Sequence, residues 1–362
     1  MKIIFDLGHP AHVHLFKYTI RNLKENGHDI KICVRERENI VGKLLEFYNF
    51  EYENIEANIP GLMNKAVAMV KNDYKLLKIA NKFKPDIFVS ITSPYSAQVS
   101  TLMGKPFIAF TDSEPTRLIL SLTLPFTNTV ITPIGFNKDL GEKHVRIKGF
   151  KELAYLHPNW FKPDPNILNM LNVSKDEKYV ILRFNAFDSS HDIGVKGFSL
   201  ADKRKLVNGL KEHAKIFISS ELKLPSDLEK YAIDIPPHKM HDALYYACLL
   251  VGDTQTLTTE SACLGIPAIR CNSFVGTNDM SNFVELEENY GLIFNYNDSK
   301  KAIEKSLNII QEQNIGQEWK HKMDKLHNDK IDVTAFFTWF IEEYPKSFGI
   351  IREHLDYQDR FK

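Results

Sequence analysis

The sequence predicts an α/β protein built from two similar, doubly wound, Rossmann-like halves. Short apolar runs bounded by Gly, Pro or Asp alternate with longer segments of helical period, which is typical of parallel sheets covered by helices. The same pattern restarts near residue 178. The chain has 362 residues, which is enough for two domains on a prior of ~150 residues per domain.

The first half begins with a strand, a helix that Gly27 ends, and a second strand. A further helix is expected at 43–48, and the strands of this half are expected at 3–5, 30–34, 86–90, 107–110 and 130–131, the last of these closing the half. The second half has expected strands at 179–184, 216–219, 249–253 and 268–270 and is helical from 299 onward.

The two halves are joined by a stiff segment between Gly149 and Pro165, which contains three prolines. We therefore expect an N-terminal Rossmann-like domain at 1–160. A second Rossmann-like domain is expected at 161–335. The aromatic segment at 336–362 is expected to be a helix that packs back on the body.

Composition excludes several classes of protein. Lys plus Arg and Asp plus Glu each number 46, so the formal net charge is zero and nucleic acid is not an expected partner. The longest apolar run, Ala243 to Val251, is far shorter than the ~18 residues of a membrane span. No export signal is visible, which favours the cytoplasm. The four cysteines lack C-x-x-C spacing, so we expect neither zinc nor disulfides.

The loop after the first strand holds three histidines, His9, His12 and His14. Nearby imidazoles can chelate zinc or manganese, but no later Asp/His cluster completes a ligand set, so we expect no metal. A helix-capping or core role is the simplest alternative. Acid–base or substrate contact near a helix N-terminus is favoured, and we take His12 and His14 as catalytic candidates.

The loop after the third strand of the second half is the main binding candidate. Asp253, Thr254, Gln255 and Thr256 can offer side chains and backbone N–H groups to a phosphate. Glu260, in the first turns of the next helix, can accept hydrogen bonds from two ribose hydroxyls. The alternative is an ordinary N-cap at Thr254 or Thr256 with an acidic first turn.

Several motifs resemble known families. The stretch from Gly252 to Arg270 is similar to the nucleotide-sugar signature of the glycosyltransferase B fold, shared with UDP-N-acetylglucosamine 2-epimerases, in which a Glu at the place of Glu260 holds the ribose. The resemblance implies two domains facing a cleft. Gly8 to Asp29 looks like the first βα unit of the same superfamily, including the lipid-linked N-acetylglucosamine transferase of peptidoglycan synthesis, whose loop histidine His12 matches.

Nearly the whole chain resembles a prokaryotic family known as domain of unknown function 354. Four phrases carry this resemblance: His9-Pro10-x-His12-Val13-His14, Lys151 to Pro158, Ser190 to Gly194, and Gly252 to Thr256. The chain departs from the epimerase pattern, which places Ser-Gly-Gly at Thr254-Gln255-Thr256 and an acidic residue at Thr259.

Two further segments are candidate contacts. The segment after the first strand of the second half, where this fold places a diphosphate, carries Arg183, His191 and Lys196 among glycines, and we expect these three side chains to bind the nucleotide sugar. In the first half, Asp112 and Glu114 follow a buried strand. Either could be the general base that deprotonates an acceptor, or both could be ordinary solvated acids of a turn.

The leading hypothesis is a metal-independent glycosyltransferase without a cofactor, using a nucleotide diphosphate sugar, most simply a UDP-sugar, in polysaccharide biosynthesis. A nucleotide-sugar epimerase or hydrolase is the second hypothesis, and a non-catalytic nucleotide-sugar-binding protein is the third. The domain at 1–160 is expected to be on the acceptor side, with a glycan or a lipid-linked molecule as acceptor, and the domain at 161–335 is expected to bind the nucleotide sugar. Residues 61–84 carry six lysines against one acid beside an apolar face, which predicts either a sheet-covering helix with solvated lysines or a peripheral contact with the inner face of the membrane.

Overall fold

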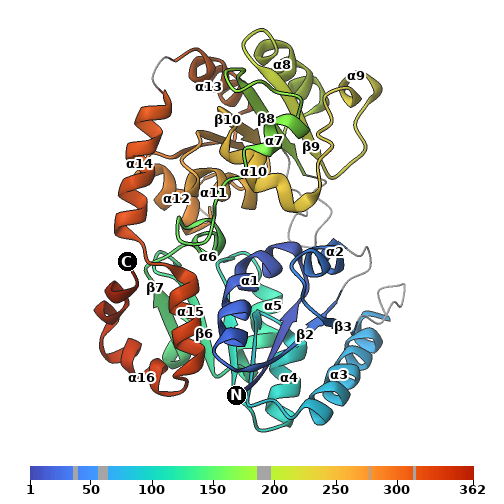
Figure 1. Cartoon of the computed structure of the whole chain (residues 1–362), viewed down its shortest axis with the longest axis vertical. Helices are drawn as coiled ribbons and strands as arrows, with labels where there is room; N and C mark the ends of the chain where they lie inside the picture. The colour runs from blue at the N-terminus through green and yellow to red at the C-terminus, as the bar shows by residue number, and fades with distance from the viewer. Residues whose placement is uncertain (36–39, 56–63, 186–196, 277–278, 313–314) are drawn as a thin grey trace. The chain divides into compact units, whose positions relative to one another are not determined.

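The computed structural model describes residues 1–35, 40–55, 64–185, 197–276, 279–312 and 315–362. The chain forms two compact units (Figure 1). Unit 1 contains Met1–Tyr155 and Lys330–Lys362, and unit 2 contains Leu156–Asp329. Each unit has a parallel sheet covered by helices, so the predicted α/β class is confirmed.

Unit 1 is built on a seven-stranded sheet with the order β3-β2-β1-β4-β5-β6-β7. Its strands are β1 (Lys2–Leu7), β2 (Asp29–Val34), β3 (Tyr52–Asn54), β4 (Ile87–Ile91), β5 (Phe107–Phe110), β6 (Thr129–Pro133) and β7 (His144–Ile147). The connecting helices are α1 (Pro10–Glu25), α2 (Ile40–Phe47), α3 (Asn64–Phe83), α4 (Pro94–Leu102) and α5 (Arg117–Thr123), with the short α6 (Leu153–Leu156) at the end of the unit.

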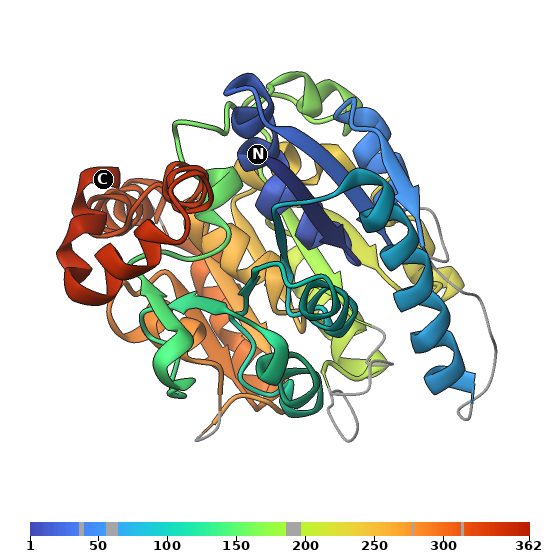
Figure 2. The same ribbon diagram turned by 90° about the horizontal axis from the view of Figure 1, so that it is seen from below.

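Both faces of the unit 1 sheet are apolar, because alternate residues of its strands point to opposite sides. On one face, Phe5 contacts Phe16 of α1 at a ring-centroid distance of 5.4 Å. On the other face, Leu76 of α3 and Ala97 of α4 join the core around Phe88. Helices α3 and α4 therefore cover one side of the sheet and α1 the other, as Figure 2 shows.

The C-terminal segment returns to unit 1 as α15 (Val333–Glu342), α16 (Lys346–Glu353) and a 3-10 helix (Leu355–Phe361). Asp332 begins α15, and its side chain accepts a hydrogen bond from the backbone N–H of Ala335 at 2.9 Å. Phe337 packs on Phe16 of α1 and on Phe110 of β5 at centroid distances of 5.7 and 5.8 Å. The aromatic residues of this segment are thus part of the unit 1 core.

Unit 2 has a five-stranded sheet with the order β12-β11-β10-β8-β9. Its strands are β8 (Tyr179–Phe184), β9 (Lys215–Ser220), β10 (Leu249–Gly252), β11 (Ala268–Cys271) and β12 (Ile293–Tyr296). Its helices are α7 (Asn166–Met170), α8 (Leu200–Leu210), α9 (Ser226–Glu229), α10 (Met240–Tyr245), α11 (Thr256–Cys263), α12 (Ser281–Glu288), α13 (Ser299–Gln311) and α14 (Ile315–Asp329).

Helices α8 and α13 cover one face of the unit 2 sheet. Leu206 and Ile309 of these helices pack with Leu182, Val251 and Ile269 of the central strands. Helices α11 and α12 lie against the remaining strand surface, beside β10, β11 and β12.

Three strands were not predicted from the sequence, namely β3, β7 and β12. The expectation that residues 130–131 form the last strand of the first half is wrong, because β7 follows and pairs with β6. β3 and β7 are short and only partly buried strands at the two edges of the unit 1 sheet, and β12 has one buried residue at an edge of the unit 2 sheet. Such strands lack the continuous apolar run that marks a buried parallel strand.

Candidate functional site

The carboxyl edge of the unit 2 sheet has a switch point between β8 and β10, which lie side by side although β9 separates them in sequence. Gly252 of β10 pairs with Arg183 of β8. A Cβ atom at residue 252 would lie 2.6 Å from the carbonyl oxygen of Arg183, so this close approach requires glycine. Ligands of open α/β sheets bind outside the carboxyl ends of the strands at a switch point. The residues that follow β8 and β10 are therefore the candidate site of unit 2.

Asp253 follows β10 and holds both ends of the segment that leads from β8 to α8. Its Oδ1 accepts a hydrogen bond from the backbone N–H of Asn185 at 2.7 Å. Burial raises the pKa of the Asp253 carboxyl to about 6, although the backbone N–H groups of Asn185 and Phe198 act in the opposite direction. A Cβ atom at Gly197 would lie 2.2 Å from Oδ2 of Asp253, so glycine is required there. Asp253 thus contacts residues at the start and at the end of this segment.

The start of α11 leaves a buried hydroxyl at the switch point. Gln255 is the N-cap residue and its side chain makes no capping hydrogen bond, so the N-cap interpretation of Thr254 or Thr256 is wrong. The carbonyl oxygen of Thr254 accepts a hydrogen bond from Oγ1 of Thr258 at 2.9 Å. Thr254 is buried, and its own Oγ1 has no hydrogen-bond partner among the described residues.

Glu260 lies inside α11 and is paired with a histidine that the sequence alone did not indicate. Its Oε1 is 3.0 Å from Nε2 of His241, which α10 supplies. Both side chains are more than nine-tenths buried. One carboxylate oxygen of the predicted ribose acceptor is therefore held by the protein itself, which fixes the orientation of the carboxylate. The available signal was a histidine two positions before the apolar run that begins at Ala243.

Arg183 lies near the end of β8, and its guanidinium is held by two residues of the β9 side. Nη1 donates to Oγ of Ser219 at 2.8 Å, and Nη2 contacts Oε1 of Glu221 at 2.7 Å. A diphosphate bound by Arg183 would share the guanidinium with Glu221. The other two predicted contacts of this region, His191 and Lys196, lie outside the described residues.

In unit 1, the three histidines of the first loop have different surroundings. His9 is the N-cap of α1, and its Nδ1 accepts a hydrogen bond from the backbone N–H of Ala11 at 3.2 Å. Nδ1 of His12 accepts from the backbone N–H of Gly8 at 3.2 Å, which assigns the ring proton of the neutral form to Nε2. Burial lowers the pKa of His12 well below its usual value, and the charges of Arg35 and other neighbours add to this effect. His12 is therefore a neutral hydrogen-bond donor.

His14 is buried among aromatic rings. Its ring lies 5.4 Å from that of Tyr155 and 6.4 Å from that of Tyr48, measured between centroids. Lys17, one turn later on α1, donates to the hydroxyl of Tyr48 at 3.1 Å. These contacts form a packed polar cluster under the first loop.

Asp112 and Glu114 follow β5 at the carboxyl edge of the unit 1 sheet. Lys151 pairs with Asp112 and also lies 3.2 Å from Oε1 of Glu152. Burial disfavours the charged form of Lys151, but the two carboxylates outweigh burial and raise its pKa above the usual value. Glu114 is buried, and its backbone carbonyl accepts a hydrogen bond from Lys138. Asp112 is thus an ion-paired carboxylate, whereas Glu114 is a buried one.

A buried carboxylate at the unit 1 switch point was not predicted. Asp6 is the last residue but one of β1, which lies between β2 and β4, and it is fully buried. It accepts hydrogen bonds from Oγ of Ser96 at 2.9 Å, from Nε of Arg35 at 3.0 Å and from Ser93. A buried carboxylate needs hydrogen-bond donors, and the two serines and Arg35 supply them. The sequence signal for this group was an acidic residue near the end of an apolar strand.

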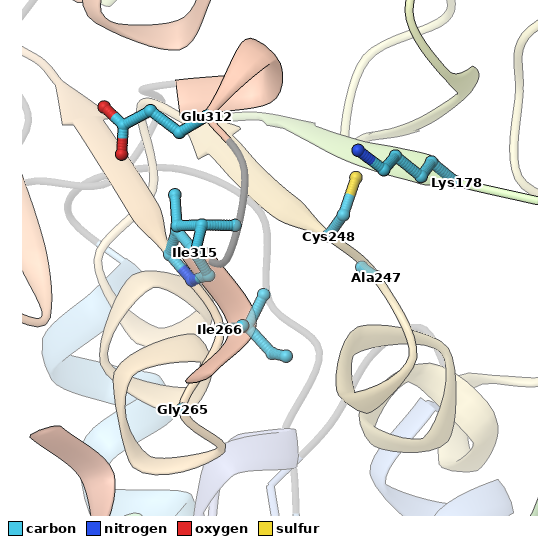
Figure 3. A pocket seen from close by; sticks show the side chains of 9 residues that line it. Lys178, Ala247, Cys248, Gly265, Ile266, Glu312 and Ile315 are labelled. Carbon is cyan, nitrogen blue, oxygen red and sulfur yellow. The ribbon is translucent and has the colours of Figure 1, made fainter. Parts of the chain in front are cut away.

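A pocket of about 300 Å³ lies at the opposite, amino edge of the unit 2 sheet (Figure 3). Lys178, directly before β8, and Pro267, directly before β11, contribute to its lining together with Ile266 and Cys248. Burial raises the pKa of the Cys248 thiol to about 11, although the nearby Lys178 lowers it. The thiol is therefore protonated at neutral pH, and this pocket is separate from the switch point.

Within the described ranges, no group of three or more His, Cys, Asp or Glu side chains is placed to hold a metal ion. In the same part of the chain, every helix is too short or too polar to cross a membrane.

Residues 1–334 match the family described as "Protein of unknown function (DUF354)". A curated relative, an uncharacterized protein of Methanocaldococcus jannaschii, is 24% identical over 318 residues, which cover 80% of this chain and 92% of the relative. The fold is similar to that of the UDP-GlcNAc 2-epimerase of the same organism, solved with UDP-GlcNAc and UDP, with a TM-score of 0.61 and 15% identity over 86% of this chain and 94% of that chain.

The fold of this chain is also similar to that of a solved glycosyltransferase. The structure of glycosyltransferase VinC with dTDP has a TM-score of 0.60 and 10% identity over 94% of this chain and 99% of that chain. At such identities the likeness shows the fold alone. The chain has the glycosyltransferase B fold, which transferases and 2-epimerases share.

Proposed function

This chain belongs to the family described as protein of unknown function DUF354, and we propose that it is a glycosyltransferase. The proposed reaction moves a sugar from a nucleotide diphosphate sugar, most simply a UDP-sugar, to an acceptor in the biosynthesis of a cell-surface glycan or polysaccharide. Unit 2 binds the donor, and unit 1 binds the acceptor.

The observation that carries the proposal is the arrangement at the unit 2 switch point. Glu260, a carboxylate held in one orientation, lies on α11, and just before this helix the buried hydroxyl of Thr254 has no hydrogen-bond partner in the described part of the chain. Asp253 holds the adjoining segment. A ribose with two vicinal hydroxyls suits a fixed carboxylate, and a diphosphate suits the hydroxyl, the N-terminus of α11 and Arg183. The co-crystallised ligands of the two similar structures, UDP-GlcNAc with UDP and dTDP, are of this chemical class.

In the proposed transfer, the acceptor oxygen forms a bond to the anomeric carbon while the bond from that carbon to the diphosphate breaks. The nucleoside diphosphate leaves with the electron pair, and Arg183 together with Lys196 and the helix N-terminus stabilises its charge. No metal is needed for this step. His191, Gln255 and Thr256 are the remaining proposed contacts with the nucleotide sugar.

The acceptor proton passes to a carboxylate of unit 1. Asp112 and Glu114 are the proposed bases, and the buried Glu114 suits this role better because Lys151 already neutralises Asp112. His12, with its proton on Nε2, donates a hydrogen bond to a substrate oxygen instead of acting as the base. His14 supports the loop from below through its ring contacts.

A nucleotide-sugar 2-epimerase is the second candidate, because the fold is at least as similar to epimerases as to transferases: the putative UDP-N-acetylglucosamine 2-epimerase of Listeria monocytogenes has a TM-score of 0.68. The residues at the switch point favour the transferase. Thr254-Gln255-Thr256 replaces the Ser-Gly-Gly of the epimerase pattern, and Thr259 stands where that pattern has an acid.

The acceptor is proposed to be lipid-linked and to be reached from the inner face of the membrane. Along α3, Val67, Val70 and Tyr74 are 48, 67 and 68% exposed, and Lys71 and Lys78 lie on the same helical stripe. We name these five residues the outer stripe of α3. Exposed apolar side chains next to lysines suit the boundary between acyl chains and anionic headgroups.

Two measurements test the proposal. Titration calorimetry with UDP, GDP, CDP and dTDP should give saturable binding of at least one nucleotide, and absence of binding for all four would overturn it. Sedimentation with vesicles of phosphatidylglycerol should be lost at high ionic strength and in the double variant Val70→Ser and Lys71→Glu. The matched control, Lys43→Glu on α2, exchanges another exposed lysine and should sediment like the original protein.

A further inference from the structure

A second pocket of unit 1, of about 480 Å³, is lined by an unusual excess of lysines. It lies between α3 and the edge of the sheet formed by β1, β2 and β3. Its lysines are Lys2, Lys31, Lys75, Lys78 and Lys82. Glu53 is the one carboxylate among the described residues that line it. The chain as a whole is electrically neutral, so this local excess of positive charge is a property of the pocket.

Among the described residues that line the pocket, five lysines stand against one carboxylate. Glu53 is committed to Lys31, with 2.9 Å between Oε1 and Nζ. The ammonium group of Lys2 lies 5.5 Å from the ring centroid of Phe83, an aromatic ring and not an anion. Like charges that converge on one cavity repel each other unless an anion lies between them.

The floor of the pocket is apolar. Ile55 is fully buried, and Ile79 and Phe83 of α3 are half-buried. A volume of this size falls in the range of ligand pockets, ~300–1,000 Å³. The ligand class that matches both surfaces is a phosphorylated molecule whose charged group contacts the lysines and whose carbon part lies on Ile79 and Phe83.

This pocket is separate from the proposed reaction centre. Lys2 is the first residue of β1, whereas the histidine loop follows Leu7 at the other end of that strand. Six residues of strand span roughly 17 Å at ~3.3 Å per residue. The outer stripe of α3 shares Lys78 with the pocket lining, whereas its other members, Val67, Val70, Lys71 and Tyr74, do not line the pocket.

From these observations we propose that the lysine pocket between α3 and the β1–β3 edge binds a phosphate group carried by a partly apolar molecule. Phosphate is the shared chemistry of two sources, a phospholipid headgroup and a soluble phosphorylated metabolite. The pocket does not include any residue of the proposed nucleotide site. This proposal can therefore be tested independently of the proposed transferase activity.

The test uses the full chain and two probes, inorganic pyrophosphate in titration calorimetry and vesicles of phosphatidylglycerol and phosphatidylcholine in sedimentation. The pocket variant is the double change Lys31→Gln and Lys82→Gln, and the matched control is Lys43→Gln with Lys346→Gln, two exposed lysines outside both the pocket and the outer stripe of α3. Lys31 is half-buried and the other three lysines are exposed, so both proteins should fold, and UDP titration reports on unit 2 independently.

Saturable binding of either probe, weakened roughly tenfold or more in the pocket variant and unchanged in the control, is the expected result. Binding of pyrophosphate identifies a soluble source, and binding of the vesicles alone identifies a headgroup. The proposal is overturned if neither probe binds, or if the pocket variant and the control lose affinity equally, because then any exposed lysine would serve.

Discussion

Replacing Glu260 should affect both the stability of unit 2 and the binding of nucleotide, and the two effects can be separated. In Glu260→Ala, the buried Nε2 of His241 loses its partner at 3.0 Å. An unsatisfied buried polar group costs ~1–3 kcal/mol, and at ~2–4 °C per kcal/mol the midpoint of thermal unfolding should fall by roughly 2–12 °C. Loss of charge-assisted hydrogen bonds to the ribose should also weaken nucleotide binding by ~1.5–3 kcal/mol, or roughly 10- to 150-fold.

Glu260→Gln separates the two effects, because its amide oxygen can still accept from His241 whereas its charge is gone. We expect nearly normal thermal unfolding and UDP binding weakened about tenfold in titration calorimetry. Glu288→Gln, the same chemical change at an exposed position of α12, is the matched control. The reasoning would be refuted by a Glu260→Gln protein that binds UDP as tightly as the control.

The remaining predictions concern protonation and metal. Because burial raises the pKa of Asp253 from 3.8 to about 6, the folded protein binds this proton more tightly than the unfolded chain, and its stability should fall by ~3 kcal/mol as the pH rises from ~4 to ~6. Urea unfolding at several pH values should show this slope, and Asp253→Asn should remove it. The ring of His12 should remain neutral as the pH falls through ~6.5, so an NMR titration step of His12 near that pH would contradict its assigned state. Transfer activity should persist in EDTA, and a loss that zinc or manganese restores would return His9, His12 and His14 to the role of metal ligands.

The sequence predicts the buried parts of the fold well. Central strands such as β4, β8 and β10 are continuous apolar runs, and Gly27 adopts the positive φ of 84° that ends α1. The edge strands β3, β7 and β12 escape prediction because they are short and only partly buried, whereas the edge strand β9 contains the apolar run Ile216 to Ile218 and was predicted. The return of α15 to unit 1 depends on aromatic contacts between residues more than 300 positions apart, which no local pattern encodes.

The sequence indicates the candidate site residues by their type and position but does not indicate their partners. Arg183 lies near the end of β8, and Asp253 and Glu260 follow β10, so all three residues are at the carboxyl side of the unit 2 sheet. Their partners His241, Phe198 and Glu221 come from other elements, and only the tertiary fold brings them close. These partners also change the chemistry of the three residues. His241 orients the carboxylate of Glu260, the backbone contacts of Asp253 hold the neighbouring segment, and Glu221 partly neutralises the charge of Arg183.

Product analysis with a radiolabelled UDP-sugar tests the central claim most directly. The protein is incubated with UDP-N-acetylglucosamine labelled in the sugar, with and without a lipid extract that supplies acceptors, and the products are separated. The account predicts labelled lipid and an equal amount of UDP only when the extract is present, with both lost in Glu114→Gln. Appearance of the 2-epimer of the sugar, free or nucleotide-linked, in the reaction without acceptor would contradict the account and establish the epimerase.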